Sequence, residues 1–145
     1  MKKLLSLFKF IVLVCFLCQI ISCKKDPTPA TTVTKYPIQG LWIGTYTVDG
    51  QDKLGAQYFS FIIKPDGTLI ADTKGDNQQH LSVGTYTLNG STLNCTFTCV
   101  YGIQSNIGIT ETSTAAWDNT GKLVGTWKNI APNSGSGIIT LTRVN

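Results

Sequence analysis

Residues suited to catalysis and to binding polyanions are scarce in this chain. It contains one histidine, His80, and one arginine, Arg143, and charged residues make up only 14% of the sequence. From residue 38 onward six basic residues stand against seven acidic ones, and the lysines are scattered. A near-neutral segment without a basic stripe is not expected to bind nucleic acid.

No catalytic or metal-binding motif accompanies the single histidine. His80 ends the polar segment 75–80, which we interpret as a surface loop, and no serine or cysteine motif goes with it. The glycines separate apolar segments and are not grouped before a helix, so no phosphate-binding loop is predicted. We therefore expect no catalytic residue, no metal site, no cofactor and no enzymatic activity.

Cysteine is rare in the part of the chain that is expected to fold. Of five cysteines, only Cys95 and Cys99 lie beyond residue 23. In one extended strand their Cα atoms would be roughly 13 Å apart, whereas a disulfide requires about 4.4–6.8 Å. The spacing predicts two unpaired buried thiols, and together with His80 they provide too few ligands for a zinc site.

The first 22 residues have the pattern of an export signal. A basic start precedes an apolar run over residues 4–21, whose densest part is short for a membrane span of about 20 residues. The sequence Ile-Ile-Ser-Cys at residues 20–23 resembles the bacterial lipobox. That resemblance implies cleavage before Cys23 and attachment of a lipid such as palmitate to its thiol. An uncleaved transmembrane anchor is the alternative.

Lipid attachment would hold the chain at a membrane. Two or more acyl chains make such an anchor stable, since each buried CH₂ contributes about 0.8 kcal/mol. An Asp after the cysteine would imply retention in the inner membrane, so Lys24 favours the outer membrane, at its periplasmic face or at the cell surface. Residues 23–37 include three prolines and almost no apolar residues, which predicts a flexible tether behind the lipidated Cys23.

The segment 38–145 is predicted to be one all-β domain. No window shows a helical apolar period, and short alternating segments are separated by Asp-Gly and Asn-Gly turns that favour hairpins. The expected strands are Leu41–Val48, Gln57–Lys64, Thr68–Thr73, Leu81–Leu88, Thr92–Tyr101, Ile107–Trp117, Leu123–Lys128 and Gly137–Val144. This order predicts an eight-stranded antiparallel up-and-down barrel.

Alternation within these strands assigns one apolar face and one face rich in threonine. The apolar face includes Trp42, Phe59, Phe97 and Trp127, and the opposite face carries most of the threonines. One apolar face on every strand is typical of a closed or nearly closed barrel. Three Gly-Thr-aromatic copies, at residues 44–46, 84–86 and 125–127, are interpreted as strand positions where glycine relieves crowding.

Two motifs at the ends of the domain point to a family. Gly40-Leu41-Trp42 opens the first predicted strand, and Arg143 lies near the end of the last. This pattern resembles that of lipocalins and other calycins, in particular the short lipocalin-like domains of bacterial lipoproteins. The resemblance implies that Arg143 packs over Trp42, beside Gly40, and closes one barrel end with a cation–π contact of about 0.5–2 kcal/mol. A fatty-acid-binding or avidin-like barrel is a neighbouring alternative.

Glu111 is the carboxylate that alternation assigns to the barrel interior, between Ile109 and Ser113. A carboxylate there must be hydrated, paired or used for a ligand. We expect four large aromatic residues near the barrel mouth to be its neighbours, namely Tyr46, Tyr86, Tyr101 and Trp127. The alternative is a β-bulge that shifts the register and returns Glu111 to solvent.

Two functions remain open at this point. The first is binding of a small, partly apolar ligand at the barrel mouth by Tyr46, Tyr86, Tyr101, Glu111 and Trp127, which the family resemblance favours. The second is a non-enzymatic interaction or assembly module of the cell envelope, with an envelope protein as partner. The large inward aromatics favour the filled lumen of this second function. The volume of a cavity would distinguish the two functions.

Overall fold

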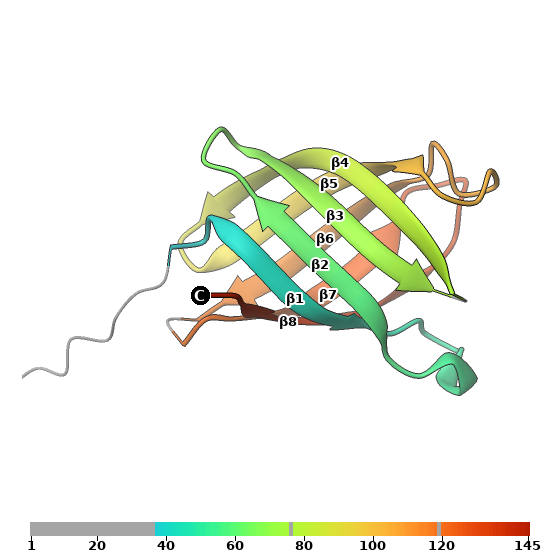
Figure 1. The fold of residues 1–145 in the computed structure, drawn as a ribbon, viewed down its shortest axis with the longest axis horizontal. Coiled ribbons are helices and arrows are strands. Elements are labelled where there is room, and N and C mark those ends of the chain that lie inside the picture. Colours follow the sequence, from blue (N-terminus) through green and yellow to red (C-terminus); the bar gives the residue numbers. More distant parts are fainter. Residues whose placement is uncertain (1–36, 76, 119) are drawn as a thin grey trace, which may run out of the picture. The chain divides into compact units, whose positions relative to one another are not determined.

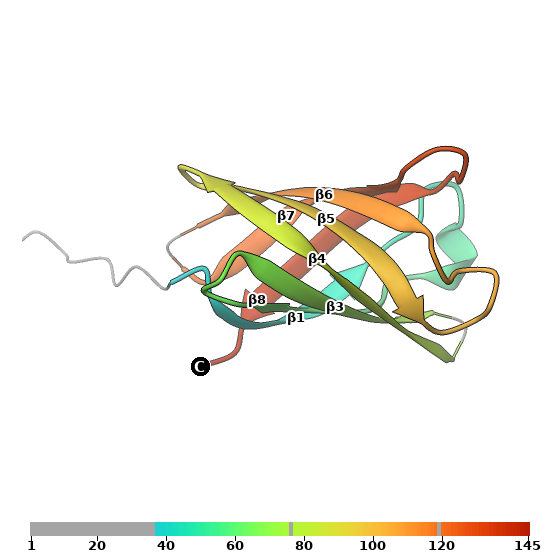
Figure 2. The same ribbon diagram turned by 90° about the horizontal axis from the view of Figure 1, so that it is seen from above.

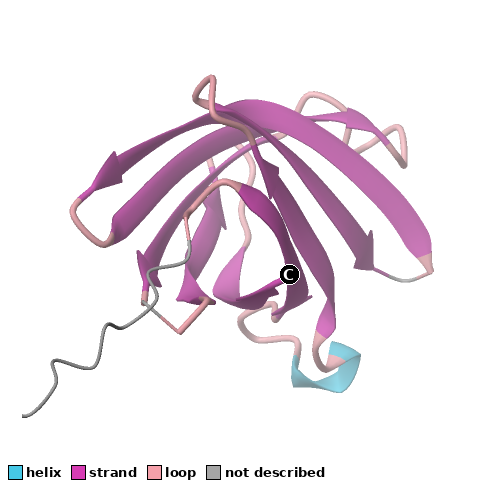
Figure 3. Ribbon diagram, turned by 60° about the vertical axis from the view of Figure 1, so that its left-hand side comes forward, coloured by secondary structure: helices cyan, strands magenta, loops and turns pink. Residues whose placement is uncertain are grey.

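The computed structural model describes residues 37–75, 77–118 and 120–145. Over these residues the chain forms eight strands and one short 3-10 helix (Figures 1 and 3). The elements are β1 (Gly40–Tyr46), η2 (Asp52–Leu54), β2 (Gln57–Ile63), β3 (Thr68–Gly75), β4 (Gln78–Asn89), β5 (Thr92–Tyr101), β6 (Thr110–Trp117), β7 (Lys122–Asn129) and β8 (Ser136–Arg143). The predicted signal at 1–22, Cys23 and the tether up to residue 36 lie outside the described residues.

The eight strands close into an antiparallel barrel. Each strand pairs with the next one along the chain, and β8 pairs with β1. The predicted all-β, up-and-down architecture is therefore confirmed. Closure leaves no sheet edge exposed. Within the described residues no helix has the length and hydropathy of a membrane span.

The strand boundaries differ most from the prediction in two regions of the chain. The strand expected from Ile107 begins at Thr110, because residues 102–109 belong to the β5–β6 connection. The polar segment 75–80 is not a surface loop, since β3 continues to Gly75 and β4 starts at Gln78, and these two residues pair. Polar side chains on both strands hide the alternation there, so the sequence pattern ends β3 too early and begins β4 too late.

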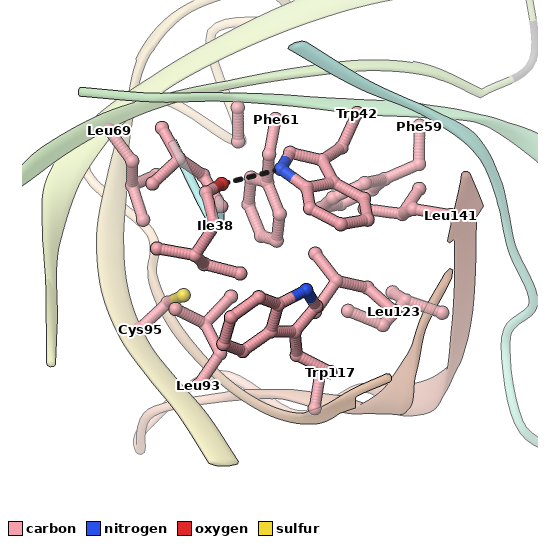
Figure 4. Close-up of a cluster of buried hydrophobic side chains, with 14 of the residues drawn as sticks. Ile38, Trp42, Phe59, Phe61, Leu69, Leu93, Cys95, Trp117, Leu123 and Leu141 are labelled. Carbon is pink, nitrogen blue, oxygen red and sulfur yellow. Dashed lines mark hydrogen bonds between the residues drawn. The ribbon is translucent and has the colours of Figure 1, made fainter. Parts of the chain in front are cut away.

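Apolar side chains from seven of the eight strands fill the barrel interior, and Tyr86 of β4 packs against them (Figure 4). The core consists of Ile38, Trp42, Phe59, Phe61, Ile63, Leu69, Ala71, Leu93, Cys95, Phe97, Ala115, Trp117, Leu123, Trp127, Ile139 and Leu141. Each large side chain contributes about 1.5–3 kcal/mol when it is fully buried. Burial of these alternate residues confirms the predicted inner face for most of the sheet.

The inward assignment of Tyr101 is wrong. Tyr101 is 60% exposed and lies on the outer face. The register between β4 and β5 shifts, because Leu81 pairs with Tyr101 whereas Ser82 pairs with Cys99. Val100 is thus the extra residue of a β-bulge, and the alternation of β5 changes after Cys99.

The three Gly-Thr-aromatic copies mark places where neighbouring strands approach closely. A Cβ atom on Gly44, Gly84 or Gly125 would lie only 2.0–2.1 Å from a carbonyl oxygen of an adjacent strand. No other residue fits at such a distance without moving the backbone. The interpretation that these glycines relieve crowding is confirmed.

The barrel has a closed end, where the described chain begins (Figures 1 and 2). There the Trp42 indole donates a hydrogen bond to the Ile38 carbonyl at 2.7 Å (Figure 4). Arg143 pairs with Trp42 in the β1–β8 ladder, and its Nη2 donates to the Gln39 carbonyl at 3.3 Å. A Cβ on Gly40 would lie 3.2 Å from that guanidinium. Gly40, Trp42 and Arg143 therefore gather at this end, and the cation–π contact stays a prediction.

The opposite end, called the open end below, carries the longer connections. Residues 47–56 join β1 to β2, residues 102–109 join β5 to β6, and residues 130–135 join β7 to β8. At the closed end the connections between strands include the short turns 64–67 and 90–91. Figure 2 shows the longer connections together at the end away from the C-terminus.

Candidate ligand-binding site

A cavity of about 170 Å³ lies inside the open end of the barrel. Its walls come from seven strands and the connections next to them: Tyr46, Val48, Phe59, Thr73, His80, Ser82, Cys99, Asn106, Ile109, Glu111, Trp127 and Asn129. Pockets for drug-sized ligands have about 300–1,000 Å³, whereas an engineered apolar cavity of about 150 Å³ binds benzene. The space is therefore suited to a molecule of about one ring, and the rest of the lumen is filled.

Three of the five predicted ligand-binding residues line this cavity, namely Tyr46, Glu111 and Trp127. The other two are elsewhere, which corrects the predicted grouping. Tyr101 is on the outer face beyond the bulge. Tyr86 packs against the core, but its hydroxyl donates to the Lys64 carbonyl at 2.8 Å, in the β2–β3 turn at the closed end. For Tyr86, alternation indicates the face of the sheet correctly but not the height along the barrel.

Aromatic rings form one wall of the cavity. Tyr46 meets Trp127 edge-on with ring centroids 5.8 Å apart, and it meets Phe59 edge-on at 6.0 Å. The Trp127 indole N–H donates to the Thr47 carbonyl at 2.9 Å. This bond and the edge-on contacts fix the rings, so the wall is formed before any ligand arrives.

Glu111 lies on the inner face of β6, partly buried in the cavity. It pairs with Phe97 of β5 and Asn129 of β7, and the bulge expected as an alternative is in β5 instead. Among the described residues none forms a hydrogen bond or an ion pair with its carboxylate. Burial raises the pKa of Glu111 from its usual 4.5 to about 7, because a poorly hydrated site disfavours the charged form.

His80 is a cavity residue that the sequence reasoning missed. It lies on β4, opposite Thr73 of β3, and Asn106 Nδ2 lies 3.1 Å from its Nε2. A Cβ on Gly102 would lie 2.2 Å from the imidazole, so the β5–β6 connection packs tightly against this ring. Extending the inward alternation of Gly84 and Ser82 back by two more residues would have placed His80 inside.

The two cysteines are unpaired buried thiols, as predicted. Burial raises the pKa of Cys95 to about 12, and burial also raises the pKa of Cys99, which lines the cavity. Thiols held neutral in this way are poor nucleophiles. Within the described parts of the chain, no three side chains of His, Cys, Asp or Glu are grouped as a metal ion would need.

Ser113 is a second polar residue of β6 without a partner. It follows Glu111 on the inner face, it is 2% exposed, and its Oγ has no hydrogen-bond partner among the residues described. Its neighbours across the sheet are Cys95 and Trp127. A buried polar atom of this kind needs an explanation, such as a bound water or ligand nearby.

Comparison with known proteins supports the architecture. No protein-family model matches the sequence, and no curated protein matches it. The chain is similar in structure to a redesigned β-barrel, mFAP1, which was solved bound to DFHBI. The TM-score is 0.51 at 17% sequence identity, and the match covers 72% of this chain and 94% of the redesigned barrel. At this identity the likeness shows the fold alone, an eight-stranded antiparallel β-barrel.

Proposed function

We propose that this protein binds a small, partly apolar ligand in the open-end cavity and is held at a membrane by a lipid on Cys23. One observation carries the binding proposal. Glu111 is partly buried in the cavity without a hydrogen bond or ion pair from the described residues, beside the fixed rings of Tyr46 and Trp127. A carboxylate in that position lowers the stability of the barrel when the cavity is empty. A ligand that forms a hydrogen bond or an ion pair with the carboxylate offsets this loss.

The solved barrel of similar fold supports this proposal in a general way. It holds DFHBI, so an eight-stranded barrel of this class can bind a small molecule. The cavity described above is small, which restricts the ligand proposed for this chain to about one ring. The proposal includes no catalytic step, since binding alone uses the residues of the cavity.

The membrane part of the proposal rests on the Ile-Ile-Ser-Cys sequence at residues 20–23. We infer export by residues 1–22, acylation of Cys23, and an outer-membrane address, at the periplasmic face or at the cell surface. Ile38 is buried at the closed end, whereas the cavity is at the open end. A barrel tethered from its closed end would leave the mouth of the cavity accessible.

Binding can be tested through the three tryptophans of the full chain. With ¹⁵N-labelled protein in a non-ionic detergent, one-ring fragments are expected to shift the indole signal of Trp127, which lines the cavity. Trp42 is fully buried at the closed end and serves as the internal control. Val48→Phe, inside the cavity, should abolish the shift, and Val124→Phe on the outer face should not. An unmoved Trp127 signal across the panel would contradict the proposal.

Acylation can be tested by growing cells with labelled palmitate. Label is expected on the wild-type chain and on Cys18→Ala, because Cys18 belongs to the proposed signal, but not on Cys23→Ala. The Cys23→Ala chain should also leave the membrane fraction. Label that persists in Cys23→Ala, or a chain that stays with membranes after losing Cys23, would refute the anchor.

One feature of the outer face favours the second candidate function, an interaction module that contacts an envelope protein. Leu41, Ile62, Ile70 and Val83 pair successively across β1, β2, β3 and β4, so they form a continuous aliphatic row. Exposed apolar patches commonly mark protein contacts. If the row is an interface, Ile62→Asp should release the chain from a native envelope complex, whereas Thr126→Asp on the far strands should not.

A further inference from the structure

We propose that the ligand of the open-end cavity is a small organic cation, an amine of about one ring whose ammonium group pairs with Glu111. This inference rests on the proposed function, because it names the charge of the ligand for the same cavity. It follows from three properties of the walls: their formal charge, their balance of hydrogen-bond donors and acceptors, and their aromatic surface.

The formal charge of the cavity is of one sign. Its twelve lining residues include one acid, Glu111, and no lysine or arginine. The folded chain already bears the cost of taking this carboxylate out of water. A cation that enters the cavity forms an ion pair with the carboxylate and so offsets this cost. An anion would be repelled by the carboxylate, and a neutral molecule would leave its charge uncompensated.

Several hydrogen-bond donors in the cavity walls are already used within the protein. The Trp127 N–H donates to the Thr47 carbonyl, and the amide nitrogen of Asn129 donates to the Ser134 carbonyl at 2.7 Å. The amide nitrogen of Asn106 lies against His80. With these nitrogens occupied by the protein, the carboxylate of Glu111 and the side-chain oxygen of Asn129 remain as acceptors for the ligand, and the hydroxyls of Thr73 and Ser82 can accept as well as donate. An ammonium group has three donors and no acceptor, so it complements such walls.

The aromatic wall also favours a cation. Tyr46, Phe59 and Trp127 surround one side of the space, and the rings of Tyr46 and Trp127 are held at 81° to each other. A cation near the face of an aromatic ring is attracted by the negative face of the ring, and the attraction is stronger when the cation is desolvated. Because the Trp127 N–H is occupied, this residue presents ring surface and not a donor to the ligand.

The proposed ion pair predicts how binding depends on pH. The titratable groups that line the cavity with Glu111 are His80 of β4, Cys99 of β5 and Tyr46 of β1. Burial raises the pKa of Glu111 to about 7 and also raises the pKa of Cys99, so the thiol stays neutral. An alkylamine keeps its proton well above that range. Amine binding should therefore strengthen as pH rises from about 5.5 to about 8.5, because Glu111 loses its proton over that range.

The test uses three probes of nearly equal size and different charge: benzylamine, benzyl alcohol and benzoate. Each is titrated into the full chain in a non-ionic detergent, and the Trp127 indole signal reports binding. Benzylamine is expected to bind about tenfold more tightly than benzyl alcohol, with benzoate weakest. Glu111→Gln should bring the first two probes close to equal affinity, while Asp72→Asn, an acid on the outer face, should leave the preference unchanged.

The outcomes separate this inference from the proposed function. Equal binding of benzylamine and benzyl alcohol at Trp127 overturns the cation preference but leaves ligand binding in the cavity standing. An amine preference that survives Glu111→Gln, or amine binding that weakens as pH rises, overturns the pairing with Glu111. If none of the three probes moves the Trp127 signal, both the inference and the proposed function fail for ligands of this size.

Discussion

The closed and open ends of the barrel are built from the same eight strands but have opposite interiors. At the closed end Trp42 is fully buried and its indole N–H is bonded to the Ile38 carbonyl. At the open end the inner face carries Glu111, a carboxylate without a partner from the described residues, beside an unfilled space of about 170 Å³. The strand ladder differs between the two ends only by the bulge at Val100, so the main difference lies in the side chains that point inward.

The difference shows how stability and binding are divided along one sheet. Apolar burial stabilises the closed end, where side chains such as Phe61 and Leu123 are almost fully hidden. The open end gives up part of that stabilisation, since a cavity and an uncompensated carboxylate both destabilise a fold. Substitutions at the two ends should therefore have different, and in one case opposite, effects on unfolding.

The largest effect is expected for Trp42→Ala at the closed end. Removing a fully buried indole should lower the free energy of unfolding by about 3–5 kcal/mol, since it leaves a void and frees the Ile38 carbonyl. Trp127→Ala should cost clearly less, because this ring borders an existing cavity. Urea unfolding followed by circular dichroism measures both, and equal losses would remove the distinction between the ends.

The second effect has the opposite sign. Glu111→Gln should raise the free energy of unfolding at about pH 8 by about 1–3 kcal/mol, because the neutral amide avoids burying a charge. Between pH 4.5 and about 7 the folded protein keeps a proton on Glu111 that the unfolded chain has already lost. Glu111 therefore makes stability fall as pH rises through that window, and the loss is complete above it.

The pH dependence provides the measurement for this second prediction. Hydrogen bonds from Thr68 lower the pKa of Asp66, and a hydrogen bond from Lys122 lowers the pKa of Asp118. The stability that these two carboxylates contribute is therefore lost only when pH falls through their lowered pKa values. Wild type and Glu111→Gln share both carboxylates. The difference between their urea midpoints across pH thus isolates Glu111, and parallel profiles above pH 4.5 would show that its burial has no energetic consequence.

The smallest effect is expected at the rim of the open end. Asn106→Ala removes the contact with His80 and should cost about 0.5–1.5 kcal/mol, the range of one hydrogen bond. Hydrogen exchange should show faster opening of residues 102–109, with protection near Trp42 unchanged. A uniform loss of protection along the barrel would mean that the rim and the closed end unfold as one unit.

Sequence alternation predicted the eight strands because threonine and apolar residues occupy opposite faces over most of the sheet. It also put Glu111 inside, since β6 keeps its register. It failed for Tyr101, because a bulge at Val100 has no signature in the residue types. It failed for His80 as well, because the β3–β4 hairpin is polar on both faces. Tyr86 shows a third limit: a period of two residues carries no information on height along a tilted strand.

The unequal lengths of the connections give the barrel one rim where change is tolerated. Insertions or deletions within residues 50–56, 103–107 or 131–134 leave the strand register intact, because the backbone hydrogen bonds that extend the ladders involve only the ends of the three connections. The turns at the closed end allow much less variation. Relatives of this chain that differ in ligand should therefore differ in the lengths of these three segments, and the same segments are where a new specificity could be engineered without unsettling the fold.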